Sequence, residues 1–377
     1  MLGLIIVAVF IVILYYVLTY LISKIKQNRR KKINVQVFDK AKEDERICTG
    51  ECKKEDNTHI VRLYNEDEIR NLYKNKDSIY VCSNGNDDND GLSEETSFES
   101  LEWAFNIAQK YKVNKITVIG KLDSMVLKDS KSIFSLAINP CFNDEILITG
   151  KTDASKSEKA ILTSKEKDIG VLFCFLMDEY SKGKIRFENI EIINGDFGLW
   201  LKEITVILGK DAVIRNNSIG VVIDVNSTLI LDGGIISGND RAINIGNSGI
   251  FSMLKGAINN NGGSEEFDNG GVLIQQGGVF KMYGGMITDN KATGDGGGVY
   301  VEGIGTFELY GGVITKNIAY NAGGGVIVLS MGIFKQNGGS IIDNEAKIGK
   351  NKNIYIQNGA IAQFADQYYD NYISSIS

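Results

Sequence analysis

The second half of the chain consists of short apolar runs, each closed by an asparagine. Aligned on that asparagine, the units read AVIRNN, GIISGN, GAINNN, GMITDN, GVITKN and GSIIDN. The asparagines follow one another at steps of 23, 22, 22, 29, 27 and 27 residues: Asn194, Asn217, Asn239, Asn261, Asn290, Asn317 and Asn344. A repeat that keeps its apolar phase while its length drifts is typical of a coil with variable turns, and not of paired helices. The pattern therefore predicts a β-solenoid.

Two further segments repeat in phase with the asparagines in the last full units. Three valines and three phenylalanines recur at 27-residue steps: Val272, Val299, Val326, Phe280, Phe307 and Phe334. Each unit thus holds three short strands separated by glycine-rich corners, where glycine adopts positive φ angles without strain. Three strands per turn predict a parallel β-helix with three sheets.

The recurring asparagines have a structural interpretation. Stacked coils lie one strand spacing apart, about 4.8 Å, so amide side chains can hydrogen-bond from coil to coil. Such a ladder satisfies polar groups that a turn would otherwise bury. We interpret the seven asparagines as a structural ladder and not as a ligand site.

Polar positions beside the strands alternate in charge at 27-residue steps. Two columns follow this rule in opposite senses: Lys281, Glu308 and Lys335, and Asp289, Lys316 and Asp343. Stacking in register would place these side chains about 5 Å apart, so alternation removes a repulsion and adds weak pairs. The columns are expected to hold the register and not to act in catalysis.

Two tyrosines are the candidate binding residues. Tyr283 and Tyr310 share a phase beside a Gly-Gly corner. Because side chains alternate along a strand and Phe280 and Phe307 are expected inside, both tyrosines should point outward. Exposed rings on neighbouring coils can stack on sugar faces or pack against a partner protein. The alternative is that they stack only on each other and shield the corner.

Residues 190–360 resemble the right-handed parallel β-helix repeats of bacterial surface proteins in the pectate-lyase-like superfamily. The stretch 79–118 is similar to the segment that opens many such helices: a strand, an Asn/Asp/Gly turn and a capping helix. A likeness to the polymorphic outer-membrane protein repeats is partial, because the units here read GGGV and ITxN. The resemblance implies a right-handed parallel β-helix and leaves the activity open.

The expected capping helix has its own signals. Thr96 and Glu99 have the spacing of a capping box, in which each side chain bonds the other residue's backbone N–H. Four apolar residues share one face of the following helix: Phe98, Leu101, Phe105 and Ala108. This face is suited to cover the exposed strand edges of the first coil.

The N-terminal segment predicts a membrane anchor. Residues 2–22 are apolar apart from Thr19 and three tyrosines, and 21 residues span about 31 Å as a helix, enough to cross a bilayer. A basic start and a small-residue cleavage site are missing, so we expect a retained single-pass helix. Six basic residues at 24–32 place the rest of the chain in the cytoplasm by the positive-inside rule. The resemblance implies the cell surface, and the sequence leaves the side open.

The expected organisation is therefore linear. A transmembrane anchor is followed by a charged tether with one helix around Glu66–Tyr73, then by a cap with the opening strand, and last by the β-helix, regular from about 186 to 360 and closed by a C-terminal cap. The boundaries are 1–23, 24–77, 78–120 and 121–377.

Composition narrows the partners. The net charge is −6, and it becomes −12 without the six cations at 24–32, so a nucleic-acid partner is not expected. Five cysteines lie outside the regular repeats. Cys48 and Cys52 could form a disulfide or half of a metal site, and the sequence leaves their pairing open.

Candidate chemistry in the repeats is sparse. The only histidine, His59, lies in the tether, which excludes histidine chemistry within the solenoid. One thin candidate groove combines two arginines with three acids, but the acids do not share a phase, and no catalytic residue is assigned: Arg215, Arg241, Asp224, Asp232 and Asp240. The turn 87–91 has the composition of a Ca²⁺ loop without its later bidentate glutamate, so a structural turn is favoured and no metal or cofactor is assigned.

Two classes of function compete. The first is a membrane-tethered, non-enzymatic solenoid that binds cell-envelope polysaccharide or a surface protein, as an adhesin or scaffold does. The second is a lyase or hydrolase that acts on an acidic polysaccharide. If the charge rule holds, a cytoplasm-facing β-helical scaffold is a third possibility. Regular repeats without a long variable loop favour the first class.

Overall fold

The computed structural model describes residues 66–124, 134–138, 145–154, 159–164, 170–175, 183–264, 267–349 and 351–365. The chain divides into two compact units, 1–63 and 64–377, and all described residues belong to the second. No helix among the described residues is long and apolar enough to cross a membrane. The expected anchor at 2–22, Cys48, Cys52, His59 and the chain beyond 365 lie outside the described residues.

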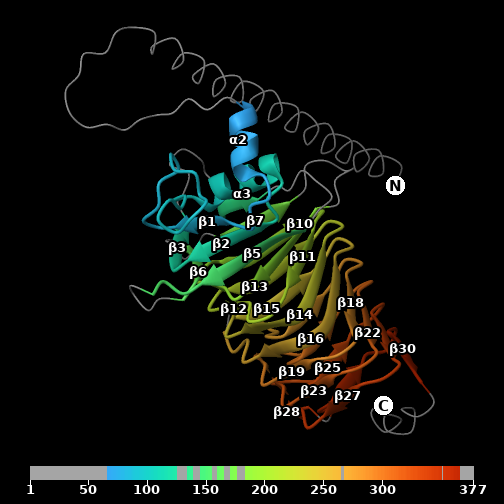
Figure 1. Ribbon diagram of the computed structural model, residues 1–377. Coiled ribbons are helices and arrows are strands. Elements are labelled where there is room, and N and C mark those ends of the chain that lie inside the picture. Colours follow the sequence, from blue (N-terminus) through green and yellow to red (C-terminus); the bar gives the residue numbers. More distant parts are fainter. Residues whose placement is uncertain are drawn as a thin grey trace, which may run out of the picture. The chain divides into compact units, whose positions relative to one another are not determined.

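Parallel strands stack coil upon coil in three ladders (Figure 1). The first ladder runs through β1 (Ile79–Cys82), β2 (Lys115–Ile119), β5 (Glu145–Lys151), β8 (Lys184–Glu188), β11 (Thr205–Leu208), β14 (Thr228–Ser237), β16 (Ile250–Asn259), β18 (Val279–Met282), β22 (Thr306–Leu309), β26 (Ile333–Gln336) and β30 (Ile361–Phe364). The second runs through β3 (Lys121–Ser124), β6 (Ile161–Ser164), β9 (Glu191–Ile193), β12 (Val213–Arg215), the second halves of β14 and β16, β19 (Met286–Thr288), β23 (Val313–Thr315) and β27 (Ser340–Ile342). Because β14 and β16 continue through the corner, the two ladders form one sheet.

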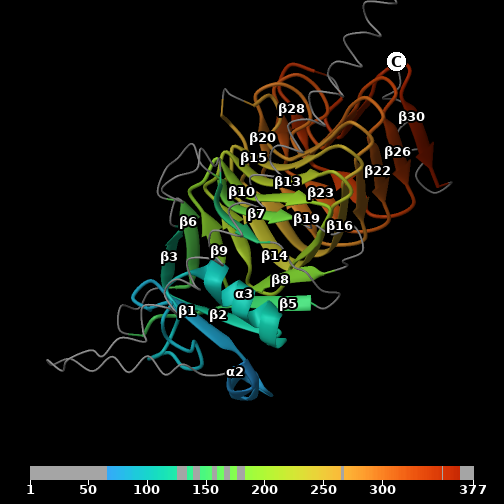
Figure 2. The same ribbon diagram turned by 90° about the horizontal axis from the view of Figure 1, so that it is seen from above.

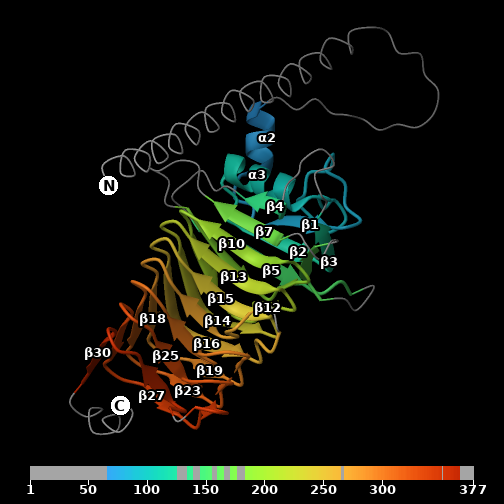
Figure 3. The same ribbon diagram turned by 180° about the vertical axis from the view of Figure 1, so that it is seen from behind.

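The third ladder forms a separate sheet, seen from behind in Figure 3. It contains β4 (Phe134–Ile138), β7 (Gly170–Phe175), β10 (Phe197–Lys202), β13 (Ile219–Asp224), β15 (Arg241–Ile245), β17 (Val272–Ile274), β21 (Val299–Val301), β25 (Val326–Val328) and β29 (Ile354–Ile356). A third sheet consists of the two-residue strands β20 (Lys291–Ala292), β24 (Ile318–Ala319) and β28 (Glu345–Ala346). The prediction of stacked parallel strands, three to a coil, is confirmed.

The variable repeat length originates in one connection. Between the ladder asparagine and the third ladder, the chain advances from Asn239 to Ile243 in one coil, but from Asn261 to the paired Val272 in the next. The seven additional residues account for the step of 29. Later coils keep a shorter extension, which forms β20, β24 and β28. The core strands stay in register because the extra residues lie outside them.

The core repeats from coil to coil. The inward phenylalanines of four successive coils are fully buried and stack with ring centroids 4.6, 4.8 and 5.3 Å apart: Phe251, Phe280, Phe307 and Phe334. The second ladder contributes a column of buried isoleucines in the same coils: Ile258, Ile287, Ile314 and Ile341. The stacking places Phe280 and Phe307 each between two other rings, so truncation of either one disturbs three coils.

Helices cover the start of the coil. Helix α3 (Leu101–Tyr111) contacts β1, β2 and β4 and has a buried apolar face. Figure 2 shows it beside β1 and β2. Helix α2 (Glu66–Tyr73) forms where the sequence predicts it and packs on the same core through Tyr73, whose ring stacks on Tyr111 at 4.8 Å. Segment 66–73 thus belongs to the packed unit that begins at Tyr64.

The capping box expected between Thr96 and Glu99 does not form. Ser100 is the N-cap of α3, and its Oγ accepts a hydrogen bond from the Trp103 N–H at 3.1 Å. Thr96 donates instead to Asp90 Oδ1 at 2.6 Å, and the Glu99 N–H donates to Asp87. The acidic turn engages both residues, so the helix begins four residues later than Thr96 would place it.

Replacement of Phe307 by Ala should lower the free energy of unfolding by about 3–5 kcal/mol, because it leaves a void between two rings that cannot close on each other. Thermal and urea unfolding of the full-length protein measure the loss. Ile304→Ala is the matched control, since Ile304 is 63% exposed and should lose little. Equal effects of the two changes would contradict the stacked core.

Candidate functional site

The asparagine ladder is the most complete polar arrangement in the protein. Asn317 is fully buried. Its Oδ1 accepts from the backbone N–H of Asn290 at 3.1 Å and from the Asn290 Nδ2 at 2.9 Å. Its Nδ2 donates to Asn344 Oδ1 at 3.0 Å and to two backbone carbonyls, those of Ile287 and Thr315. The amide is saturated by its neighbours, which leaves it no capacity to bind a ligand.

The same bonding connects six of the seven expected asparagines: Asn217, Asn239, Asn261, Asn290, Asn317 and Asn344. The ladder explains why the third residue of the GGGV pattern is glycine. At Gly298 a Cβ would lie 3.1 Å from Asn317 Nδ2 and 2.6 Å from a backbone oxygen.

The ladder differs from the expectation at both ends. Asn194 is exposed at φ +63°, and the neighbouring Gly195 takes the ladder place, where its N–H donates to Asn217 Oδ1 at 2.9 Å. The step of 23 residues, one longer than the next, was the signal for this shift. At the other end Asn353, which the sequence analysis missed, accepts from Asn344 at 3.0 and 3.1 Å. Asn353 lies immediately before β29 of the third ladder, only nine residues after Asn344, so it does not follow the spacing of the other ladder asparagines.

One of the two charge columns consists of ion pairs. Glu308 lies between Lys281 at 3.8 Å and Lys335 at 3.1 Å, and its side chain is only 12% exposed. Burial raises the pKa of the Glu308 carboxyl, but hydrogen bonds from Lys335 and Tyr310 and the charges of both lysines outweigh it, so the pKa lies below its usual range. In the second column, Asp289, Lys316 and Asp343 share a left-handed corner position with φ of 54–57°.

The two candidate tyrosines lie together on the outside. Tyr283 and Tyr310 are 47% and 42% exposed, and their rings stack at 5.0 Å with an interplanar angle of 8°. The Tyr310 hydroxyl donates to Glu308 at 3.1 Å. Leu254, also exposed, precedes Tyr283 in the same column. The rings are parallel, so one face of each is covered by the other ring.

These tyrosines are part of a larger charge-poor face, which we define as the outward surface of residues 228–237, 250–259, 279–288, 306–315 and 333–342. It includes seven of the large exposed apolar residues: Ile235, Ile250, Leu254, Tyr283, Met286, Tyr310 and Ile342. Its only charged residues are Asp232, Lys255, Lys281, Glu308 and Lys335. Each of them is ion-paired within the face, the first two with each other at 3.2 Å. Depletion of charge with exposed Tyr and Met is typical of protein interfaces.

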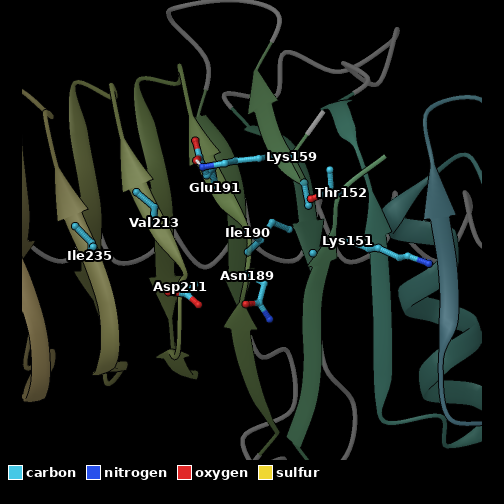
Figure 4. Close-up of a pocket in the computed structure, with 11 residues that line it drawn as sticks. Lys151, Thr152, Lys159, Asn189, Ile190, Glu191, Asp211, Val213 and Ile235 are labelled. Atoms are coloured by element: carbon cyan, nitrogen blue, oxygen red, sulfur yellow. Dashed lines mark hydrogen bonds and ion pairs between the residues drawn. The ribbon is translucent and has the colours of Figure 1, made fainter. Parts of the chain in front are cut away.

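A groove of about 700 Å³ opens beside this face (Figure 4). Its charged residues are partly neutralised, since Glu191 pairs with Lys159 at 3.5 Å and with Arg215 at 2.6 Å. Val213 and Ile235 line it from neighbouring strands and continue into the apolar column of the second ladder. The groove thus adjoins the charge-poor face at Ile235, but its own lining includes the charged residues Lys151, Lys159, Glu191 and Asp211.

The thin groove of arginines and aspartates expected from the sequence does not form. Arg215 is paired with Glu191, and Asp232 with Lys255. Asp224 accepts from Trp200 and from Asn247. Arg241 lies 4.4 Å from the Phe267 ring centre, and burial lowers the pKa of its guanidinium. The expected residues thus take part in separate contacts.

An ion network that the sequence did not predict is centred on Arg186. Arg186 bonds Glu145 at 2.7 Å and lies 3.4 Å from Asp232, two coils further on. It crosses the intervening coil at Gly209, where a Cβ would lie 3.1 Å from the Arg186 Nη1 and 2.8 Å from Glu188. The network ties three coils together and involves no free cation for chemistry.

The acidic turn at 87–91 is engaged in backbone bonding. Asp87 Oδ1 accepts from the N–H groups of Glu99 and Ser100, and Asp90 Oδ1 accepts from Leu92 and Thr96. Among the described residues, no group of three or more His, Cys, Asp or Glu side chains could hold a metal ion.

Comparison of the chain with known protein families, curated proteins and solved structures finds no match.

Replacement of Asn317 by Ala should lower the free energy of unfolding by about 1–3 kcal/mol, because it leaves buried partners on both neighbouring coils without a bond. Asn194→Ala is the control, because Asn194 lies outside the ladder and is exposed. Urea unfolding of the full-length protein measures both. A loss at Asn194 as large as that at Asn317 would contradict the assignment of Gly195 to the ladder.

The Glu308 column should contribute a pH-dependent part of stability. The folded pKa lies below the unfolded value of about 4.3, so the ionised carboxyl stabilises the fold above that value and loses this contribution as pH falls through the folded pKa. Glu308→Gln should cost about 0.2–1 kcal/mol at neutral pH and low salt, and the difference from wild type should vanish at acid pH. Asp343→Asn is the control. An identical pH dependence of stability for the two variants would contradict the assignment of this contribution to the Glu308 ion pairs.

Proposed function

We propose that this protein is a membrane-anchored β-solenoid that acts by binding another macromolecule through the charge-poor face, without chemistry of its own. The observation that carries the proposal is the exposed Tyr283–Tyr310 stack within a sheet face whose few charges are all internally paired. Such a face gains free energy when it is covered, because apolar atoms leave water and no charge is left unpaired. The anchor would be residues 2–22, as their length and apolar composition predict.

A protein surface is favoured over polysaccharide as the target. A sugar ring stacks on the face of an aromatic ring, and in this protein one face of each tyrosine ring is already covered by the other ring, 5.0 Å away. The ring edges, together with Met286 and Leu254, present an apolar ridge instead. Ridges of this kind pack against complementary protein surfaces.

The resemblance to bacterial surface proteins of the pectate-lyase-like superfamily supports a display role outside the cell, and the charge rule supports a scaffold in the cytoplasm. Protease treatment of intact cells distinguishes the two, because only an outward-facing solenoid is cleaved. For the enzyme alternative, the groove at Glu191 would be the location. The charged residues that line it are Lys151, Lys159, Glu191 and Asp211. Glu191 is paired with Lys159 and with Arg215, which lies outside the lining, and nothing in that arrangement favours catalysis.

Coverage of the face can be measured by hydroxyl-radical oxidation of native membranes. Met286 lies on the face and Met331 off it, and they are 43% and 61% exposed in the isolated chain. We expect Met286 to be protected severalfold relative to Met331. The double variant Tyr283→Ala, Tyr310→Ala should lose this protection while its melting temperature stays nearly unchanged, because both side chains are exposed.

Tyr320→Ala is the matched control, since Tyr320 is 49% exposed and lies outside the charge-poor face. Oxidation of Met286 in proportion to its exposure in wild-type membranes would show that nothing covers the face. A large loss of stability in the double variant would show that the role of the two tyrosines is purely structural. Protection by isolated envelope polysaccharide would shift the target to sugar.

A further inference from the structure

We propose that the partner of the charge-poor face is a second copy of this chain. The inference rests on the proposed function and specifies its partner. Two copies related by a two-fold axis would bring the same apolar columns together, so that each face covers the other. The columns at the centre of that contact are Leu254, Tyr283 and Tyr310 on one side of the corner and Ile235 and Met286 on the other.

The charge distribution of the chain favours a second copy of itself as the partner. Residues 64–377 contain 40 Asp and Glu against 29 Lys and Arg. Two such acidic bodies repel each other wherever they approach through unpaired charge. The charge-poor face is where they meet at least cost, because Asp232 pairs with Lys255 and Glu308 with both Lys281 and Lys335, which leaves a net charge of only +1 on the face of each copy. A face built to attract a charged partner would present uncompensated charge, as electrostatic complementarity requires.

The size of the face also fits. Five coils at about 4.8 Å and ten residues at about 3.3 Å give on the order of 800 Å² per copy as an upper bound. A stable interface buries about 800 Å² per partner. The face is thus large enough for a dimer if most of it takes part. Four of its five corners are Gly-Gly pairs without a side chain that would hold two copies apart, and in the fifth Lys255 is paired with Asp232.

The test uses two full-length chains with different tags, co-expressed and solubilised in mild detergent. One variant carries Tyr283→Glu with Met286→Glu, and the other carries Tyr283→Lys with Met286→Lys. Wild-type chains should co-purify. Each variant should lose association with itself by on the order of tenfold, since like charges then meet in a charge-poor contact. The Glu variant and the Lys variant should associate with each other, because opposite charges then face one another.

Tyr320→Glu with Ile304→Glu is the control, since both side chains are exposed outside the face and should leave association intact. Melting curves check that every variant is folded. Wild-type chains that fail to co-purify while Met286 stays protected would overturn the second copy as partner and leave the proposed binding function standing. An unprotected Met286 would remove both. Association that persists in the Glu–Glu pair would assign it to another part of the chain and also overturn the inference.

Discussion

The hydrogen bond from one coil's asparagine to the next fixes the register on which the remaining contacts depend. Each ladder amide bonds both adjacent coils and its own backbone, as at Asn317. A shift of one residue would turn inward side chains outward along a whole strand. The Phe251–Phe334 stack, the isoleucine column and the Glu308 ion pairs all need this alignment. From β14 onward, variation in coil length is therefore confined to the connection that follows the asparagine.

Regular spacing made most of the fold predictable. The 27-residue steps place Phe280 and Phe307 inside and Tyr283 outside without any structural information, because a strict period transmits one coil's orientation to the next. Prediction failed at the ends of the ladder and at the start of the capping helix. Asn194 and Gly195 both suit a corner, the 23-residue step was the one sign against Asn194, and bonding to Asn217 shows that Gly195 takes the ladder place. Ser100 replaced Thr96 as the cap because Asp90, six residues earlier in the same turn, engages the threonine hydroxyl, a local contact that the capping-box pattern does not take into account.

The candidate site was predictable in part. The phase of Tyr283 and Tyr310 followed from alternation, but the mutual stacking of their ring faces did not, since it depends on side-chain rotamers. The wider charge-poor face remained hidden because its members come from two ladders that β14 and β16 join into one sheet. Local patterns give the strands separately. They do not reveal that Leu254 and Ile235 share a surface.

The fold alone does not require an apolar outer face. Parallel coils bring identical outward positions about 5 Å apart, which penalises columns of like charge but not neutral polar residues. The next column of the second ladder shows the alternative that stacking accepts, because it runs through Ser237, Asn259, Thr288 and Thr315 before it reaches Ile342. The exposed Tyr283 and Met286 are therefore not imposed by the ladder. Exposed apolar residues that the fold does not need are best explained by a surface that covers them.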